Sequence, residues 1–271
     1  MNRRDLLRLV SALALTAPMP VLSQPKAVTK GKVSARLSAQ SAVNKAGRQR
    51  MLSQRMAKCY AQIGLNVLAV PALTIMNNST ALFELQLREL LDYAPTDASR
   101  QLFNQQSKIF DEYRDLLRST PSKENGTQVL ALSEVLLKNA QAATVELDKI
   151  SGMPAAAIVN LAGRQRMLSQ RTAKFYFFAD WGVSNNSSLE IKQNSDEFRA
   201  AITTLKSSPI VMPDIRANIA LGESQWHFFE SALVAQAQGK GDEISRRNVA
   251  TTSERILEVF EIVTQLLEQV A

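Results

Sequence analysis

Hydrophobic residues recur every three or four positions in two long stretches, one at the end of each half of the chain. The stretch near the C-terminus carries Val249, Thr252, Ile256, Val259, Val263, Leu266 and Val270. The stretch that ends the first half carries Val129, Leu132, Leu136, Ala140, Ala143, Leu147 and Ile150. This spacing places the side chains on one face of an α-helix. The pattern therefore predicts two long amphipathic helices.

Turn-forming residues divide the rest of the chain into further helical stretches. They include Pro71, Pro95, Pro121, residues 185–187 and residues 239–242. Gly152 and Pro154 mark the middle of the chain, where one helix can end and the next can begin. We expect helices over approximately residues 33–69, 80–93, 97–119, 127–150, 155–183, 188–206, 213–238 and 242–270. The composition agrees, because it is rich in residues that favour helix.

A duplicated segment relates the two halves. Residues 44–55 read NKAGRQRMLSQR and residues 160–171 read NLAGRQRMLSQR, so eleven of twelve residues are the same at an offset of 116. A repeat of this length has the size of a small domain. We therefore expect an all-α fold of two tandem up-down four-helix bundles, related by internal duplication as a pseudo-dimer. The expected domains cover residues 33–151 and 155–271.

The repeated segment places one arginine on an unusual helical face. At about 100° per residue, Arg50 shares a face with small or amide residues, which are Ala46, Gly47, Ser53, Gln54 and Ala57. A separate apolar stripe, expected to face the core, contains Leu52, Met56, Cys59 and Ile63. Arg48 and Arg55 fall at the edge of that stripe, where solvated or structural roles are expected. The second copy repeats the face with Ala162, Gly163, Arg166, Ser169, Gln170 and Ala173.

Arg50 and Arg166 are the central candidates for ligand binding. No acid lies in either segment, and burying an unpaired guanidinium is costly. Three arrangements are open: an acid from another helix, a hydrated face, or a bound anion. If the two copies face each other across a pseudo-twofold axis, a small oxyanion could accept hydrogen bonds from both arginines. The candidate ligand-binding residues are Arg50, Arg166, Gly47, Gly163, Gln54, Gln170, Ser53 and Ser169.

The first 23 residues have the pattern of an export signal. MNRRDLLR supplies a charged start, LVSALALTA a short apolar core, and residues 21–23 a cleavage site. The Arg3-Arg4 pair is typical of a twin-arginine signal, and an ordinary secretory signal with a basic start is the alternative. We expect a periplasmic mature chain without a membrane anchor.

The remaining composition argues against several functional classes. The net charge of +7 is spread along the chain, which favours a small anion over nucleic acid. His227 is the only histidine, and no nucleophile set or phosphate loop accompanies it, so we expect no enzyme, metal or cofactor. Cys59 is expected to be a buried core thiol, with a reactive or metal-binding role as the alternative. Aromatic residues expected in the core are Phe110, Tyr113, Trp226, Phe228 and Phe229.

The duplicated segments resemble the signature of the PilJ/NarX-type periplasmic sensor domain of type IV pilus chemotaxis transducers and nitrate/nitrite sensor kinases. The resemblance rests on NKAGRQRMLSQRMAK and NLAGRQRMLSQRTAK, and NVATTSERILEVFEIVTQLLEQV resembles the last helix of such domains. It implies four-helix sensor domains. In the family's nitrate sensors, the arginine before the methionine binds the anion between two first helices. The resemblance therefore implies this role for Arg50 and Arg166, with Gly47 and Gly163 beside the ligand.

The sequence also departs from the usual members of that family. Those members are membrane-spanning receptors, whereas we expect no anchor or transmitter after the signal here. Pilus-type members have no established nitrate role. The resemblance predicts a chemotaxis-related sensor of nitrate or nitrite that reports to a periplasmic partner such as a receptor or transporter. The alternative is a ligand-free scaffold that docks on a receptor, transporter or type IV pilus component. A scaffold predicts acids paired with Arg50 and Arg166, and a sensor predicts an unpaired, facing couple.

Overall fold

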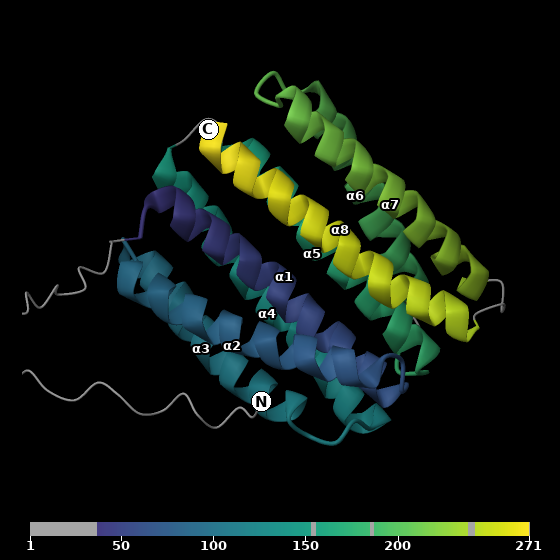
Figure 1. Cartoon of the computed structure of the whole chain (residues 1–271). Coiled ribbons are helices and arrows are strands. Elements are labelled where there is room, and N and C mark those ends of the chain that lie inside the picture. Colours follow the sequence, from purple (N-terminus) through teal and green to yellow (C-terminus); the bar gives the residue numbers. More distant parts are fainter. Residues whose placement is uncertain (1–36, 153–155, 185–186, 238–241, 271) are drawn as a thin grey trace, which may run out of the picture. The chain divides into compact units, whose positions relative to one another are not determined.

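Eight α-helices follow one another in the part of the chain that the computed structural model describes (Figure 1). That part comprises residues 37–152, 156–184, 187–237 and 242–270. The helices are α1 (Ala39–Gly64), α2 (Ala69–Tyr93), α3 (Asp97–Leu117), α4 (Lys123–Ser151), α5 (Ala156–Asp180), α6 (Ser187–Ser207), α7 (Pro213–Ala237) and α8 (Glu243–Val270). No strand occurs within these residues, so the predicted all-α class is confirmed.

The helices of each half contact one another in a ring. In the first half, α1 packs on α2, α2 on α3, α3 on α4, and α4 on α1. In the second half, α5, α6, α7 and α8 make the corresponding contacts. Such rings are the neighbour relations of four-helix bundles, as the sequence predicted. The two first helices, α1 and α5, pack extensively on each other and join the halves.

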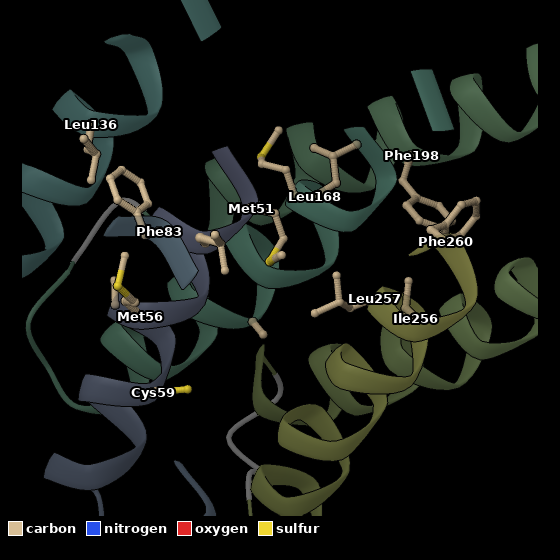
Figure 2. Packing of buried hydrophobic residues seen from close by; sticks show 14 of the residues in the cluster. Met51, Met56, Cys59, Phe83, Leu136, Leu168, Phe198, Ile256, Leu257 and Phe260 are labelled. Atoms are coloured by element: carbon tan, nitrogen blue, oxygen red, sulfur yellow. The ribbon is translucent and has the colours of Figure 1, made fainter. Parts of the chain in front are cut away.

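One hydrophobic cluster extends through both halves. Figure 2 shows Phe83 and Met56 grouped in the first half, and Phe198 and Phe260 grouped in the second. The rings of Phe198 and Trp226 stack with centroids 3.7 Å apart. Most of the predicted aromatic core is confirmed, because Phe110, Tyr113, Trp226 and Phe229 are buried. The prediction for Phe228 was wrong: it is 69% exposed, because it lies on the outer face of α7.

Helices α1 and α5 are buried on nearly all sides although they are rich in polar residues. In α1 the buried polar side chains are Gln49, Arg50, Ser53, Gln54, Lys58 and Gln62. A helix surrounded by protein is normally apolar all round. Polar side chains in that position need partners on neighbouring helices. This requirement determines most contacts of the candidate site.

Helix α2 begins at Ala69, eleven residues before the predicted start at residue 80. Pro71 lies in the first turn of the helix, where the missing N–H of proline breaks no helical hydrogen bond. The prediction was wrong because it treated Pro71 as the end of a helix. Helix α1 ends at Gly64. The predicted extension of this helix to residue 69 was therefore also wrong, because it too placed the break at Pro71.

Helix α4 begins at Lys123 and not at residue 127. The Ser122 side chain caps this helix, because its Oγ accepts a hydrogen bond from the backbone N–H of Asn125 at 3.1 Å. Gly126 therefore lies inside the helix rather than before it. The predicted stop at the end of the first half is confirmed, because Gly152 caps α4 with a φ of 61°.

Trp181, directly after α5, lies against two glycines of the first half. A Cβ added at Gly64 would lie 2.3 Å from the indole ring, and one added at Gly126 would lie 2.8 Å from it. Only residues without a side chain allow this approach, since real Cβ contacts are not that short. The two glycines therefore provide the space in which Trp181 joins the halves.

The variant Gly64→Ala should lower the free energy of unfolding by about 1–3 kcal/mol, the usual cost of overpacking. Alanine gains helix propensity of up to about 1 kcal/mol, but its methyl group displaces the Trp181 ring. Urea denaturation followed by tryptophan fluorescence measures the change. In a Trp181→Ala background the cost should disappear, and an equal cost in both backgrounds would contradict this contact.

None of the described helices has an apolar stretch long enough to cross a membrane. The predicted export signal, residues 1–23, lies outside the described residues. The division into domains over residues 33–151 and 155–271 stays a prediction.

Candidate functional site

Arg50 and Arg166 occupy the middle of α1 and α5, the two helices that join the halves. Each is only 1% exposed. Guanidinium groups are almost never buried to this extent without partners. The contacts of the two side chains therefore decide what this part of the molecule can bind.

Arg50 is held by neutral oxygen atoms. Its Nη1 donates to Oε1 of Gln141 on α4 at 2.6 Å, and its Nη2 donates to Oδ1 of Asn160 on α5 at 2.7 Å. Its Nε donates to the carbonyl of Gly47 at 3.3 Å. Among the described residues, no carboxylate lies within ion-pair distance of Arg50. Its hydrogen bonds are satisfied, but its charge is not matched.

Arg166 has the same geometry with one chemical difference. Its Nη2 donates to Oδ1 of Asn44 on α1 at 2.8 Å, and its Nε donates to the carbonyl of Gly163 at 3.3 Å. Its Nη1 donates to Oε2 of Glu261 on α8 at 2.5 Å, which makes an ion pair. Each arginine thus reaches the first asparagine of the other copy, as a pseudo-twofold arrangement of α1 and α5 requires.

Gln141 and Glu261 hold equivalent places in the two halves. They stand 120 residues apart, the offset that also relates Ser133-Glu134 on α4 to Ser253-Glu254 on α8. Glu261 additionally pairs with Arg48. The two outcomes distinguished in the sequence both occur: Arg166 has the acid that a scaffold predicts, and Arg50 lacks an acid as a sensor predicts.

Both guanidinium groups have lowered pKa values. Burial lowers the pKa of Arg50 to about 10, with a further contribution from Arg164. Burial lowers the pKa of Arg166 to about 9, with further contributions from Arg48 and Arg50. Both remain charged at neutral pH. The region therefore concentrates positive charge that Glu261 offsets only in part.

Each motif glycine makes room for the arginine three residues later. A Cβ at Gly47 would lie 3.0 Å from Nη2 of Arg50, and one at Gly163 would lie 2.9 Å from Nη2 of Arg166. The glycine therefore lets the guanidinium fold back over its own helix and bond the glycine carbonyl. A direct contact of Gly47 or Gly163 with a ligand stays a prediction.

The serine candidates bond backbone carbonyls of their own helix, and the glutamine candidates bond a neighbouring helix. Ser53 Oγ donates to the Arg50 carbonyl at 2.8 Å, and Gln54 Nε2 donates to the Ser133 carbonyl of α4 at 2.9 Å. In the second half, Ser169 and Gln170 make the corresponding bonds, with Gln170 reaching the Ser253 carbonyl of α8. The two glutamines therefore join the first and last helix of each bundle, and a ligand role for the serines and glutamines stays a prediction.

Two buried ion clusters cross between the halves and were not predicted. Lys58 and Arg55 of α1 both pair with Glu254 of α8. In the mirrored cluster, Lys174 and Arg171 of α5 pair with Glu134 of α4, at 2.5 Å and 2.7 Å. The Lys58 and Lys174 side chains are almost completely buried. The signal available in the sequence was the Ser-Glu dipeptide that recurs within the apolar stripe of each last helix.

These clusters make stability depend on pH. Burial would raise the pKa of both glutamates, but the paired lysine and arginine outweigh it and lower the pKa of Glu134 and Glu254 to about 2. In the unfolded chain glutamate titrates near 4.3. The unfolded chain therefore binds more protons between these values, and stability should fall as the pH drops from about 5 to 2.

Urea midpoints measured across that pH range test the dependence. In the double variant Glu134→Gln/Glu254→Gln, the midpoint should fall less steeply with acid than in the parent chain. An unchanged slope would mean that other carboxylates cause the acid loss.

The remaining candidates have structural environments. Burial raises the pKa of Cys59 to about 11, which argues against a reactive thiolate at neutral pH and agrees with a core thiol. His227 lies on the surface of α7, 4.0 Å from Glu230. No group of potential metal ligands occurs among the described residues. Of the solvated and structural roles expected for Arg48 and Arg55, their ion pairs with glutamates of α8 indicate the structural one.

Comparison with protein families matches residues 33–145 and 152–252 to one family, described as "Type IV pili methyl-accepting chemotaxis transducer N-term" or PilJ. Searches of curated proteins and of solved structures found no match. Sensor domains of this family are typically non-catalytic, and the N-terminal domain is usually periplasmic. The matched segments cover most of the chain and include both copies of the arginine motif. They also include the residues of α1, α4 and α5 that the two arginines contact. The protein thus belongs to the PilJ family of sensor domains.

Proposed function

We propose that this chain is a periplasmic sensor that binds a small oxyanion, nitrate or nitrite, between α1 and α5. Arg50 supplies the main charge and Arg166 the second. The observation that carries the proposal is the burial of Arg50 beside neutral amides only, at 2.6 and 2.7 Å. A planar oxyanion accepts two hydrogen bonds from one guanidinium fork and adds the negative charge that Arg50 lacks.

Binding at Arg50 would change the contact between the halves. The anion would replace Gln141 of α4 and Asn160 of α5 as acceptors, and Asn160 belongs to the other copy of the motif. An anion that binds the rearranged state better than the present one shifts the population toward it. We expect a periplasmic protein partner, such as a receptor or transporter, to recognise that state.

The ion pair between Arg166 and Glu261 favours a second candidate function. A guanidinium already neutralised at 2.5 Å needs no anion. If Arg50 tolerates its neutral partners in the same way, the chain is a ligand-free scaffold that docks on a receptor, a transporter or a type IV pilus component. The two functions differ in their response to anions.

Nitrate or nitrite should raise the melting temperature of the full chain, because a ligand of the folded state stabilises it. At 100 times the dissociation constant the gain is about 2.7 kcal/mol, or roughly 5–10 °C for a chain of this size. Thermal unfolding is measured in sodium nitrate, nitrite, sulfate, phosphate and chloride at equal ionic strength. Sulfate, phosphate and chloride should give little change.

The control variants separate the site from general salt effects. Arg50→Gln/Arg166→Gln should lose the response, and so should Arg50→Lys, which keeps the charge but not the fork. Arg118→Gln changes an arginine with a 72% exposed side chain and should keep the response. The same response to every anion, or one that survives in the double variant, would favour the scaffold.

A further inference from the structure

A cleft of about 370 Å³ lies between α5, α6 and α7, away from the arginine site. Its inner wall is formed by Tyr176, Ala179, Ile191 and Leu233. This volume is in the range that small-molecule sites occupy in proteins. The cleft belongs entirely to the second half of the chain.

The first half has a corresponding but smaller cleft of about 210 Å³. Glu84 on α2 and Arg114 on α3 line it at the places that Arg199 and Glu230 hold on α6 and α7. The acidic and basic residues of the ion pair across the cleft have therefore exchanged helices between the two halves. In the second half it is tighter, with Arg199 Nη2 2.5 Å from Glu230 Oε1. The cleft is thus a feature of the fold that the two halves have developed differently.

Two residues of α5 beside the second cleft are smaller than their counterparts on α1. Met56 and Ile63 of α1 correspond to Thr172 and Ala179 of α5 at the offset of 116. In the first half the Met56 sulfur accepts a hydrogen bond at 3.2 Å from Thr80, which lines the smaller cleft. In the second half no side chain of that length is present at either place.

Two buried hydroxyls of α5 have no hydrogen-bond partner among the described residues. Tyr60 in the first half contacts Ser119 Oγ at 3.1 Å and donates to the Thr120 carbonyl at 3.3 Å. Its counterpart Tyr176 is 1% exposed, and its hydroxyl has no hydrogen-bond partner within the part of the chain that the structure describes. Thr172, one helical turn earlier, is fully buried and its Oγ1 also lacks a partner. Native proteins rarely leave such groups unsatisfied.

Burial raises the pKa of Tyr176 above its ordinary value, with a further contribution from Asp180. The hydroxyl therefore stays protonated and able to donate. At the mouth of the cleft, Lys192 and Arg199 are already paired with Asp196, at 2.6 and 3.2 Å. A charged ligand would have to compete with these pairs, whereas an uncharged one would not.

We propose that this cleft is a second ligand site, for an uncharged molecule with an apolar body about the size of one aromatic ring and a hydroxyl or carbonyl group. The apolar body packs on Ala179, Ile191 and Leu233. The polar group bonds the hydroxyl of Tyr176. The site would give the chain an input separate from the anion, and it stands whether or not the anion proposal does.

The probe is 4-fluorophenol, with 4-fluorotoluene as its apolar counterpart and 4-fluorobenzoate as its charged one. Fluorine NMR with the full chain should show saturable broadening of the 4-fluorophenol signal. The probe concentration at half-saturation should be at least about fivefold lower than for 4-fluorotoluene or 4-fluorobenzoate. Tyr176→Phe should remove the preference for 4-fluorophenol over 4-fluorotoluene.

Two filling variants copy residues that the first half already holds at these places. Thr172→Met and Ala179→Ile should each weaken 4-fluorophenol binding by at least about tenfold while circular dichroism stays unchanged. Met56→Thr, in the first half, should leave the second site intact and serves as the matched control. The proposal is overturned by absence of binding at millimolar probe, or by binding that is unaffected in both filling variants.

Discussion

Replacing Glu254 by glutamine should lower the free energy of unfolding by about 3–5 kcal/mol, the cost of breaking a buried ion pair. Glu254 is the shared partner of Lys58 and Arg55, and the Lys58 side chain is 1% exposed. Glutamine keeps the size of the side chain but removes its charge. The buried ammonium then retains only Ser253 Oγ, at 3.2 Å, among its present partners. Urea denaturation measures the loss.

A matched variant lies one turn further along the same helix. Glu258 is exposed, and Glu258→Gln should change stability by no more than about 0.5 kcal/mol. Glu134→Gln should cost nearly as much as Glu254→Gln, because Glu134 holds Lys174 and Arg171 in the mirrored cluster. If Glu254→Gln costs less than about 1 kcal/mol, the clusters do not hold the halves together.

The fold and the central arginines could be predicted because their signals are local. Apolar spacing of three and four residues marks helices wherever they pack, and the 116-residue repeat indicates two similar units. A helical wheel alone placed Arg50 and Gly47 on one face. The structure accounts for that proximity, because Gly47 makes room for the guanidinium at 3.0 Å.

The partners of these residues could not be predicted because they come from distant helices. Glu254 meets Lys58 across 196 positions of the chain, and Asn160 meets Arg50 across 110. Nothing in the spacing of α1 reveals which side of α4 or α8 will face it. Gln141 and Glu261 were overlooked for another reason: the last helices follow an offset of 120, and an alignment at 116 does not place them together.

That overlooked pair yields the sharpest test of anion binding, which rests on the proposed function. Gln141→Glu should raise the melting temperature without anion, because it gives Arg50 the carboxylate that Arg166 already has. The same carboxylate would occupy the anion's position and repel it. We expect the dissociation constant for nitrate or nitrite to rise at least tenfold, which corresponds to about 1.4 kcal/mol.

The reverse substitution, Glu261→Gln, should have the opposite effects on stability without anion and on the response to anion. Glu261→Gln leaves Arg48 and Arg166 without their shared carboxylate, so the anion-free protein should lose about 3–5 kcal/mol. Nitrate or nitrite should then restore more stability than in the parent chain, because two uncompensated guanidinium groups gain a counter-ion. Melting temperatures of both variants with and without anion give the four values needed. General damage would lower stability in both variants, and a scaffold would show no anion response in either, so only a site at Arg50 and Arg166 predicts the crossed result.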